Sequence, residues 1–435
     1  MVVAMSVKVC LVSPGHLAGN PRLVKEADAL EQAGYQVRIV ASRFIPWADA
    51  ADTEFATRPW KLRRIAFGTL AHPLPRAYRS LRRRLARRLV ALFGFRSPWV
   101  ELAFHWITPE LTRAACSEPA ELYIAHNLAA LPAVVKAARR FGARAIFDAE
   151  DFHSGELPSD ASGDFDRKLV TALESKYLPQ CDAITAASPG IARAYAQRYR
   201  IPQPDVVLNV FPREQAPPGA DRKGNIPPGP SLYWFSQTTG ANRGLESAVR
   251  ALGLAKCRPH LYLRGAVSDS YRGQLEELAR ASGVAGHLHF LEPGAPADMA
   301  RLAAQYDVGL AAEPGHSQNN LLACSNKIFT YLLAGLPTLA SATPAQAEFA
   351  EQAQGAVFLY PPDDSQALAA ALDVLLEDPA TLASARLRAW SLGQQQFNWD
   401  IESQAWLSRV GAVINPDASR NAEPNSSPTM ESVKS

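Results

Sequence analysis

The sequence lacks several signatures that would assign a function at once. It has no Gly-x-x-x-x-Gly-Lys-Ser/Thr phosphate loop, and its first predicted strand is not followed by Gly-x-Gly-x-x-Gly. A Gly-x-Ser-x-Gly elbow and a pair of metal ligands on a predicted helix are also missing. These absences argue against P-loop enzymes, dinucleotide-dependent dehydrogenases and serine hydrolases.

Cysteine and long apolar runs are scarce as well. The five cysteines among 435 residues are scattered singly, without the spacing of metal ligands, which predicts reduced thiols in a reducing compartment. No apolar run approaches the roughly 20 residues that a membrane-spanning helix needs. The opening MVVAMSVKVCLVS has no basic region ahead of its apolar residues, so we expect no signal peptide and a cytoplasmic protein.

What the sequence does contain is a regular alternation of strands and helices in two halves. This alternation predicts an α/β fold with parallel sheets. Strands are expected at 7–13, 35–41, 121–125, 143–148, 183–186 and 206–208, and again at 231–235, 260–264, 288–291, 308–311, 338–340 and 356–359.

The two halves are separated by a proline-rich stretch. Residues 212–230 contain six prolines and three glycines, which is typical of a linker. We therefore expect a first domain at 1–211 and a second at 231–414, the latter closed by two helices at its end. The polar residues 415–435 are expected to be disordered. Two α/β domains of similar size usually place their site in the cleft between them.

An insertion at 55–100 interrupts the first domain. It has twelve Arg or Lys and no Asp or Glu, although the whole chain carries a net charge of only +3. Within 78–93 the apolar residues form one helical stripe, and arginines cover the rest. The stripe residues are Tyr78, Leu81, Leu85, Leu89, Leu92 and Phe93, and the arginines are Arg79, Arg82, Arg83, Arg84 and Arg87.

Three interpretations of this insertion stay open. A basic amphipathic helix is suited to an anionic membrane surface. Alternatively, the apolar stripe packs on the protein core and the arginines face water. Binding to nucleic acid is the least favoured, because few aromatic residues interleave with the basic ones and no binding motif accompanies them.

Another informative stretch is SNKIFTYLLAGLPTLAS, residues 325–341. It predicts a helix whose first turn is capped by the hydroxyl of Ser325 and which ends at Gly335. Lys327 lies in that first turn, where the helix dipole disfavours a cation unless an anion is bound nearby. The stretch therefore predicts an anion site, with an ordinary surface helix and a solvated lysine as the alternative.

Five stretches together carry a family resemblance. They are SPGHLAGNPRLVKEADALEQAGYQV, LYIAHNLAALPA, ITAASPGIARAY, LYWFSQTTGANRGLESAV and SNKIFTYLLAGLP, of which the last two are the more specific. Over about residues 7–412 the chain resembles a retaining glycosyltransferase of glycosyltransferase family 4. The resemblance implies the GT-B fold, which has two Rossmann-like domains facing a central cleft. It also implies a nucleoside diphosphate sugar as donor.

The resemblance implies a set of donor-site residues. Gly19, in the first strand-to-helix turn, matches a glycine that lets the backbone approach the diphosphate, and His126 matches a histidine near the donor sugar. Arg243 keeps one of two cations that face the diphosphate in the family, whereas Gln237 replaces the other. Asn209 matches the residue that opens the hinge segment, where its role is positional.

The helix at 326–334 keeps only part of the family pattern. Its Ser325-Asn326-Lys327 start occurs in one branch of the family, which supports diphosphate binding. The two glutamates that normally follow are absent, because their positions hold Leu322 and Thr330. Thr330 can make only a neutral hydrogen bond to a ribose, which is weaker than a charged one.

Acidic residues mark the acceptor side of the expected site. The run DAEDFH at 148–153 resembles a variable family segment that shapes the acceptor site, so Glu150 and Asp151 are assigned there together with Asn20. Glu313 is assigned to the same side as an acid that can take over from the missing glutamates. Read without the resemblance, the run at 148–153 could bind a metal, but no second ligand cluster supports this. We expect neither a metal nor a cofactor.

These observations predict a glycosyltransferase with His126, Arg243 and Lys327 as its catalytic residues. It is expected to transfer a sugar, with retention, to a lipid-linked or polysaccharide acceptor in the synthesis of a cell-envelope glycan or exopolysaccharide. It would work in the cytoplasm or on the inner face of the membrane. The missing glutamates keep a second hypothesis open, a catalytically degenerate binding or scaffold subunit on the same fold. A sugar-nucleotide epimerase is a lesser alternative.

Overall fold

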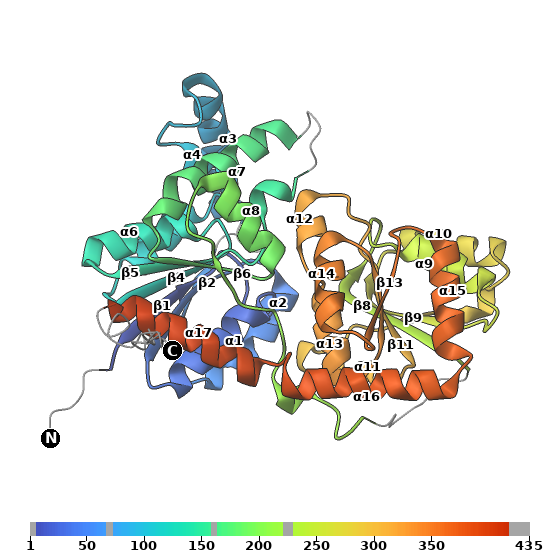
Figure 1. Cartoon of the computed structure of the whole chain (residues 1–435). Helices are drawn as coiled ribbons and strands as arrows, with labels where there is room; N and C mark the ends of the chain where they lie inside the picture. The colour runs from blue at the N-terminus through green and yellow to red at the C-terminus, as the bar shows by residue number, and fades with distance from the viewer. Residues whose placement is uncertain (1–5, 67–72, 158–162, 221–228, 417–435) are drawn as a thin grey trace, which may run out of the picture.

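The computed structural model describes residues 6–66, 73–157, 163–220 and 229–416. They form two α/β domains that stand side by side (Figure 1). The first is built on a seven-stranded sheet and the second on a six-stranded sheet, and the paired strands in both are parallel. The prediction of two Rossmann-like domains is confirmed.

The first domain carries a long insertion between its third and fourth strands. In spatial order its sheet comprises β3 (Lys61–Ala66), β2 (Gln36–Arg43), β1 (Lys8–Val12), β4 (Leu122–His126), β5 (Arg144–Asp148), β6 (Ala183–Ala186) and β7 (Asp205–Val206). Its helices are α1 (Pro21–Gln32), α2 (Pro46–Ala51), α3 (Pro73–Phe93), α4 (Val100–Phe104), α5 (Thr108–Ala115), α6 (Leu131–Phe141), α7 (Asp164–Tyr177) and α8 (Pro189–Tyr199), with short 3₁₀ turns at η1 (Asp52–Thr57) and η2 (His153–Gly155).

The second domain alternates strands and helices more regularly. Its sheet comprises β10 (Leu288–Leu291), β9 (His260–Val267), β8 (Ser231–Thr239), β11 (Val308–Ala311), β12 (Thr338–Ser341) and β13 (Val357–Tyr360). Its helices are α9 (Leu245–Leu254), α10 (Asp269–Ala281), α11 (Met299–Ala303), α12 (Gln318–Leu322), α13 (Asn326–Ala334), α14 (Pro344–Gln352), α15 (Ser365–Leu376) and α16 (Pro379–Gln395).

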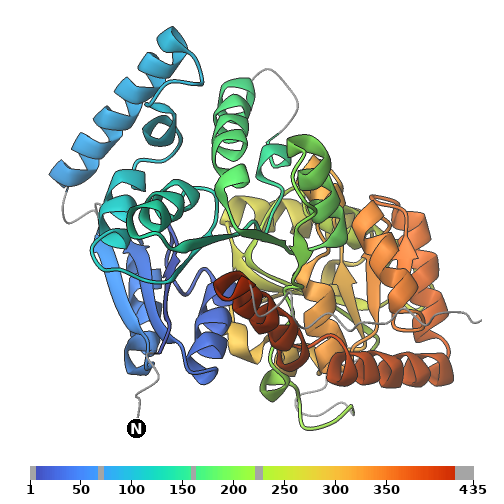
Figure 2. The same ribbon diagram turned by 60° about the vertical axis from the view of Figure 1, so that its left-hand side comes forward.

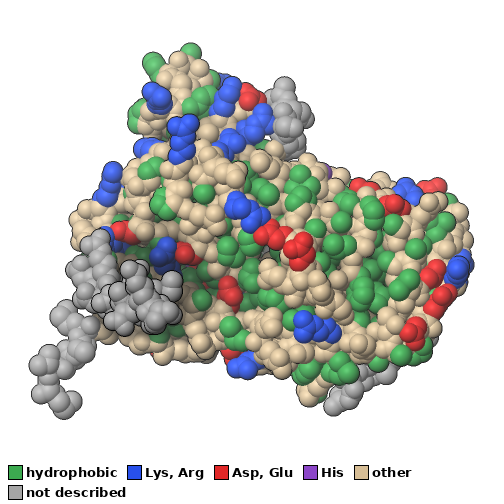
Figure 3. Space-filling view, in the orientation of Figure 1, with side chains coloured by type: hydrophobic (Ala, Val, Ile, Leu, Met, Phe, Trp, Pro, Cys, Tyr) green, Lys and Arg blue, Asp and Glu red, His purple; other side chains and the backbone are tan. Residues whose placement is uncertain are grey.

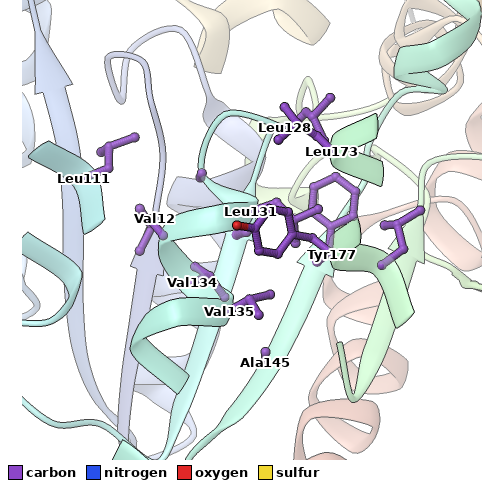
Figure 4. Close-up of a cluster of buried hydrophobic side chains, with 14 of the residues drawn as sticks. Val12, Leu111, Leu128, Leu131, Val134, Val135, Ala145, Leu173 and Tyr177 are labelled. Atoms are coloured by element: carbon purple, nitrogen blue, oxygen red, sulfur yellow. The ribbon is translucent and has the colours of Figure 1, made fainter. Parts of the chain in front are cut away.

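The core of the first domain lies on both faces of its sheet. Successive strand residues point to opposite faces, so Cys10 and Val12 join one buried cluster while Val9 and Leu11 join another. Figure 4 shows part of the former cluster, in which helices cover β1, β4 and β5. Burial on both faces explains why β1 reads as a continuous apolar run.

The strand β3 at the sheet edge was not expected within the insertion. Its sequence KLRRIA contains three basic residues, so it resembles a surface segment more than a strand. It pairs with β2 on one side only, and its side chains alternate between exposed and partly buried. Basic residues are common on such edges, since they discourage pairing with another chain.

The last helix, α17 (Trp399–Ile414), corrects the predicted end of the second domain. It crosses back and packs along α1 of the first domain (Figure 1). Its buried stripe includes Trp406, Val410 and Val413, which lie in the same cluster as Leu23 of α1. The chain therefore passes between the domains twice. The expected linker is described only at 212–220 and 229–230, and residues 417–435 of the expected tail lie outside the described residues.

The helix α3 projects from the top of the first domain (Figure 2). Its apolar stripe is not packed on the core, since Leu81 is 66% and Leu92 77% exposed. Four of the five arginines expected on its polar face instead contact the protein. Arg79 and Arg82 pair with Glu110, Arg83 donates to the carbonyls of Ala103 and Phe104, and Arg87 pairs with Asp166.

This arrangement is the opposite of the interpretation in which the apolar stripe packs on the core and the arginines face water. Carboxylates and carbonyl groups of α4, α5 and α7 attract the arginines inward, so the leucines face outward. Among the five arginines named for a membrane surface, only Arg84 is exposed, and Arg88 is exposed on the same helix. The space-filling view shows hydrophobic and basic side chains next to each other on this projection (Figure 3). No helix in the described part of the chain is both long and apolar enough to cross a membrane.

Candidate functional site

A pocket of about 430 Å³ lies between the two domains. It opens at the carboxyl ends of their strands, because the loop after β5 supplies one wall and the loop after β11 leads into the other. Parallel sheets place ligands at this edge. The first domain contributes Asp151 and Glu156, and the second contributes Glu313, His316, Ser317, Asn319, Asn320, Ala323, Cys324, Ser325, Asn326 and Lys327.

The helix α13 brings its N-terminus to this pocket. Its bounds confirm the prediction from sequence, with Ser325 at the N-cap and Gly335 at the C-cap in the left-handed conformation, φ 67°. The prediction that the Ser325 hydroxyl accepts a hydrogen bond from a first-turn amide is wrong, because the helix has no side-chain cap. The hydroxyl instead donates to Glu313 at 3.0 Å. Of the first-turn amides, that of Ile328 donates to the carbonyl of Ser325 at 3.0 Å, which leaves those of Asn326 and Lys327 for a ligand.

Glu313 is the centre of the polar network in the pocket. Besides Ser325, its carboxylate accepts hydrogen bonds from Asn320 Nδ2 at 2.9 Å and Lys327 Nζ at 3.3 Å. Lys327 also lies over the ring of Trp234, 5.3 Å from its centroid. Burial opposes ionisation of Glu313, but Lys327 and the hydrogen bonds outweigh it, so the pKa of Glu313 is lowered. The anion that the position of Lys327 predicts is, in this structure, an internal carboxylate.

The loop after β1 leaves the carboxyl end of its strand and is held by two residues that sequence reasoning missed. His16 Nε2 accepts the backbone N–H groups of Phe44 and Ile45 at 2.9 and 3.0 Å. Its Nδ1 lies 3.1 Å from Asp52, whose other oxygen accepts the N–H of Ala18 at 2.8 Å. Asp52 lies 36 residues from His16, so no local pattern could have paired them.

These contacts also bear on metal binding. His16, Asp49 and Asp52 are close enough to share an ion. However, Nε2 of His16 accepts two amides, which leaves the ring proton on Nδ1, the atom that faces Asp52. His16 is therefore a hydrogen-bond donor to Asp52 rather than a metal ligand.

The two residues predicted from this loop have different surroundings. Gly19 is exposed, and its N–H donates to the carbonyl of His16 at 3.3 Å. Asn20 caps α1, since its Oδ1 accepts the N–H of Leu23 at 3.0 Å. Asn20 is thus used structurally, whereas the Gly19 backbone is accessible to a ligand.

His126 ends β4 as predicted, but it is fully buried. Its Nε2 lies 3.2 Å from Glu26 and its Nδ1 3.2 Å from Asp148. Burial alone would lower the pKa of His126, but the two carboxylates raise it to about 10. With both ring nitrogens facing carboxylates, His126 is not available to a sugar hydroxyl in this arrangement, contrary to the expected contact.

Arg22 completes this buried network. Its guanidinium donates to both oxygens of Asp148, at 2.6 and 2.8 Å, and to the carbonyl of Val207 at 2.7 Å. Glu26, His126 and Asp148 lie within reach of a common ion. Arg22 already supplies a cation there, with its Nε 3.5 Å from Glu26, so the charges of the group compensate one another.

A second buried cation links this network to the hinge. Lys25 Nζ donates to Asn209 Oδ1 at 2.8 Å and to the carbonyl of Val210 at 2.5 Å. Its ammonium also lies 4.8 Å from the ring centroid of Trp399, at the second crossing between the domains. Asn209 Nδ2 in turn faces Glu150 at 3.5 Å. The positional role predicted for Asn209 agrees with these contacts, and Glu150 faces the hinge rather than the pocket.

The remaining predicted residues lie away from the pocket wall. Arg243 is half-buried in the turn before α9, and Gln237 is exposed where β8 pairs irregularly with β9. Thr330 is buried in α13, and its hydroxyl faces the carbonyl of Asn326 at 3.4 Å. None of the three is among the described residues that line the pocket. Direct contact of these side chains with the donor stays a prediction.

Comparison with known proteins identifies the family. A model described as "Glycosyl transferase 4-like domain" matches residues 19–210, and one described as "Glycosyl transferases group 1" matches residues 229–378. Together they cover most of the chain and both of its domains. No curated protein matches the chain significantly.

Solved structures share the fold at low sequence identity. The sucrose-phosphate synthase of Thermosynechococcus elongatus is 16% identical, with a TM-score of 0.72 over 94% of this chain and 100% of that one. Anabaena HepE in complex with UDP-glucose is 16% identical, with a TM-score of 0.66 over 93% and 99% of the two chains. WaaG, a glycosyltransferase involved in lipopolysaccharide biosynthesis, is 14% identical, with a TM-score of 0.58 over 92% and 98%.

The two family models match the two domains, and the pocket lies between these domains. The chain is a glycosyltransferase of the GT-B fold and belongs to the group related to glycosyltransferase family 4.

Proposed function

We propose that the enzyme takes a nucleoside diphosphate sugar as donor and binds its diphosphate at the N-terminus of α13. The observation that carries this proposal is the start of α13 in a pocket between the domains, where the side chain of Lys327 lies beside the backbone N–H groups of residues 326 and 327. Helix N-termini favour anions through their N–H groups and their dipole. The Anabaena neighbour was solved with UDP and with UDP-glucose, which supports a donor of this class.

Leaving-group stabilisation is the main chemistry proposed for this site. As the bond to the sugar breaks, negative charge develops on the diphosphate, and preorganised cations and amides stabilise it. We assign this role to Lys327, and Arg243 is the second cation that the family pattern assigns to it. An incoming diphosphate would have to compete with Glu313 for Lys327. We propose that no metal or cofactor is needed.

The opposite wall of the pocket suits the acceptor. Asp151 and Glu156 of the first domain line it together with Asn319 and Ser317 of the second, and Asn319 donates to Asp151 at 2.9 Å. Carboxylates and amides are suited to the hydroxyl groups of a glycan, because each accepts or donates directional hydrogen bonds. We assign this side to a lipid-linked or polysaccharide acceptor, to which the sugar is transferred with retention.

The exposed face of α3 supports a role at an anionic membrane surface. Tyr78, Leu81, Leu85 and Leu92 are more than half exposed there, and Arg84 and Arg88 lie among them. Apolar side chains that enter the headgroup region beside arginines that contact lipid phosphates are typical of helices lying in the interface. A lipid-linked acceptor in a cell envelope would be reached from this position.

A donor screen tests the proposed function. UDP, GDP and their glucose, galactose and mannose derivatives are titrated by calorimetry and assayed for transfer or slow hydrolysis. Lys327→Ala and Arg243→Ala should each lower turnover by at least about tenfold, or about 1.4 kcal/mol of transition-state stabilisation, and leave the fold intact. Lys256→Ala, which removes an exposed lysine of the same domain, should have no effect.

The outcomes separate the two hypotheses. Binding of one nucleotide with loss of turnover in Lys327→Ala supports the enzyme. Absence of binding to every nucleotide would favour the degenerate scaffold. The Glu313–Lys327 pair and the missing glutamates are the observations that motivate this hypothesis. Carbon-13 NMR of the first transfer product would then show whether the anomeric configuration is retained.

A further inference from the structure

We propose that Asn319 is a positioning residue that holds the carboxylate of Asp151 in the pocket across the domain boundary. Its neighbour Asn320 joins this contact to the anion site at α13. The proposal rests on the proposed function only in taking Asp151 as a group that receives an acceptor hydroxyl.

The side chain of Asn319 makes two hydrogen bonds to the other domain. Its Oδ1 accepts the backbone N–H of Phe152 at 2.7 Å, and its Nδ2 donates to Asp151 Oδ1 at 2.9 Å. The acceptor end of the amide must meet the N–H group and the donor end must meet the carboxylate, so the orientation of the amide is determined. One side chain therefore positions both the backbone N–H group of Phe152 and the carboxylate of Asp151.

The short helix α12 is placed to carry this contact. It is capped by Ser317, whose Oγ accepts the N–H of Asn320 at 3.1 Å, and it meets α8 and η2 of the first domain (Figure 1). At its other end the carbonyl of Leu322 accepts the hydroxyl of Ser188 at 2.5 Å. The helix thus bridges the domains beside the pocket that it lines.

Asn320 faces the opposite way from Asn319. Its Nδ2 donates to Glu313 at 2.9 Å and its Oδ1 accepts the N–H of Gly315 at 2.6 Å. Glu313 then contacts Ser325 and Lys327 at the start of α13. The consecutive side chains of Asn319 and Asn320 therefore connect Asp151 of the first domain to the anion site of the second. In the proposal, closure of the domains orders Asp151 and the anion site together.

The charge of Asp151 depends on this contact. Burial raises its pKa, while His153 and the hydrogen bond from Asn319 oppose the rise. The other charged groups near it are Glu156, which raises its pKa, Arg22, which lowers it, and Glu150, the adjacent residue in the chain. Loss of the Asn319 donor would leave the ionised form less stabilised, so the pKa of Asp151 would rise further.

Two substitutions separate the two hydrogen bonds of Asn319. Asn319→Ala removes both. Asn319→Asp keeps an acceptor for the Phe152 N–H group but loses the donor and places a second carboxylate against Asp151. Arg193→Ala is the matched control, because it breaks a different contact between the domains, the pair of Arg193 with Glu348 at 2.5 Å.

Three readouts test the proposal. Amide hydrogen exchange reports the Phe152 contact, and carbon-13 NMR of aspartate-labelled protein reports the pKa of Asp151, both without any activity. The third is turnover of UDP-glucose. We expect Phe152 exchange to accelerate at least about tenfold in Asn319→Ala and to change little in Asn319→Asp or Arg193→Ala. In Asn319→Asp the pKa of Asp151 should rise by about one unit, and kcat should fall while KM for UDP-glucose stays within about twofold.

The contrary results are distinct. Unchanged Phe152 exchange in Asn319→Ala would show that the contact is not made. An unchanged pKa of Asp151 in Asn319→Asp would reduce Asn319 to a structural contact and overturn the positioning role. If the wild type turns over none of the screened UDP and GDP sugars, the donor proposal is at fault, and the exchange and NMR results still decide the role of Asn319.

Discussion

At the residue scale, the main finding is that Lys327 already has an anionic partner. Glu313 lies 3.3 Å from it and also accepts hydrogen bonds from Ser325 and Asn320. A carboxylate at this place repels a diphosphate and competes for the same ammonium. Lys327 should therefore raise the affinity for a nucleotide, and Glu313 should lower it.

This competition gives the first prediction. Glu313→Gln should increase the affinity for UDP several-fold, because it keeps a hydrogen-bonding group of similar size and removes the negative charge. Lys327→Ala should decrease the affinity at least about tenfold, as expected for a charge-assisted contact. Calorimetric titration measures both, with Lys256→Ala as the control. Weaker UDP binding by Glu313→Gln would mean that Glu313 contacts the ligand instead of competing with it.

The buried His126 provides a prediction about pH. Its pKa is raised to about 10 in the folded protein, above the ordinary value of 6.5. The stability that it adds is therefore fully present below pH 6.5 and is lost as the pH rises through about 10. The difference in unfolding free energy between wild type and His126→Gln should be larger at pH 6.5 than at pH 9.5, as measured by urea denaturation.

A second histidine serves as the control for this measurement. Burial lowers the pKa of His105 to about 4, so it is neutral at both pH values. In the unfolded chain His105 is about half protonated at pH 6.5, so the effect of His105→Gln on stability should differ by only about 0.4 kcal/mol between pH 6.5 and pH 9.5. An equal effect of His126→Gln at both pH values would show that Glu26 and Asp148 do not keep the imidazole protonated.

At the element scale, α3 presents an unusual helix face. Its leucines are exposed, while most of its arginines contact acidic residues and carbonyls of α4, α5 and α7. Replacing Arg82 or Arg87 would therefore loosen the helix from its domain and would not test membrane binding alone. The exposed residues Leu81, Arg84, Leu85 and Arg88 allow a direct test.

We expect Leu81→Gln with Leu85→Gln to release the protein from vesicles that contain phosphatidylglycerol. Each leucine loses on the order of 1.5–3 kcal/mol of apolar burial. Arg84→Gln with Arg88→Gln should weaken binding by about 1 kcal/mol per arginine, and only on anionic vesicles. Arg250→Gln, which changes an exposed arginine of the second domain, is the control. Unchanged co-sedimentation of the leucine variant would end the membrane proposal.

At the scale of the whole molecule, closure of the domains depends on a close approach of α8 to α12. A side chain at Gly190 would bring its Cβ within 3.1 Å of the carbonyl oxygen of Leu322. Gly190→Val should therefore hold the domains apart. We expect a larger radius of gyration in small-angle scattering and at least about tenfold slower transfer, since closure assembles the site.

Gly411→Val is the matched control for this wedge. A Cβ at Gly411 in α17 would meet no atom within 4 Å, so the variant should keep the scattering profile of the wild type. If Gly190→Val also keeps that profile and its turnover, contact between α8 and α12 is not required for the reaction.

The sequence by itself determined most of the elements and their order, although not the edge strand β3. Apolar strand runs, helix ends at residues such as Ser325 and Gly335, and the proline-rich stretch depend on neighbours in the chain, so the two parallel sheets and the bounds of α13 were predictable. The anion site was also predictable in part, because the helix dipole disfavours a lysine in the first turn unless an anion lies nearby.

Only the tertiary structure decided which side chains meet. Glu313 neutralises Lys327, Glu26 and Asp148 enclose His126, Asn319 reaches Asp151 across the domain boundary, and α17 returns to α1. Each of these contacts joins residues that lie far apart in the chain or on different elements. Their energies depend on burial and on the distance between charges, which no local sequence pattern contains.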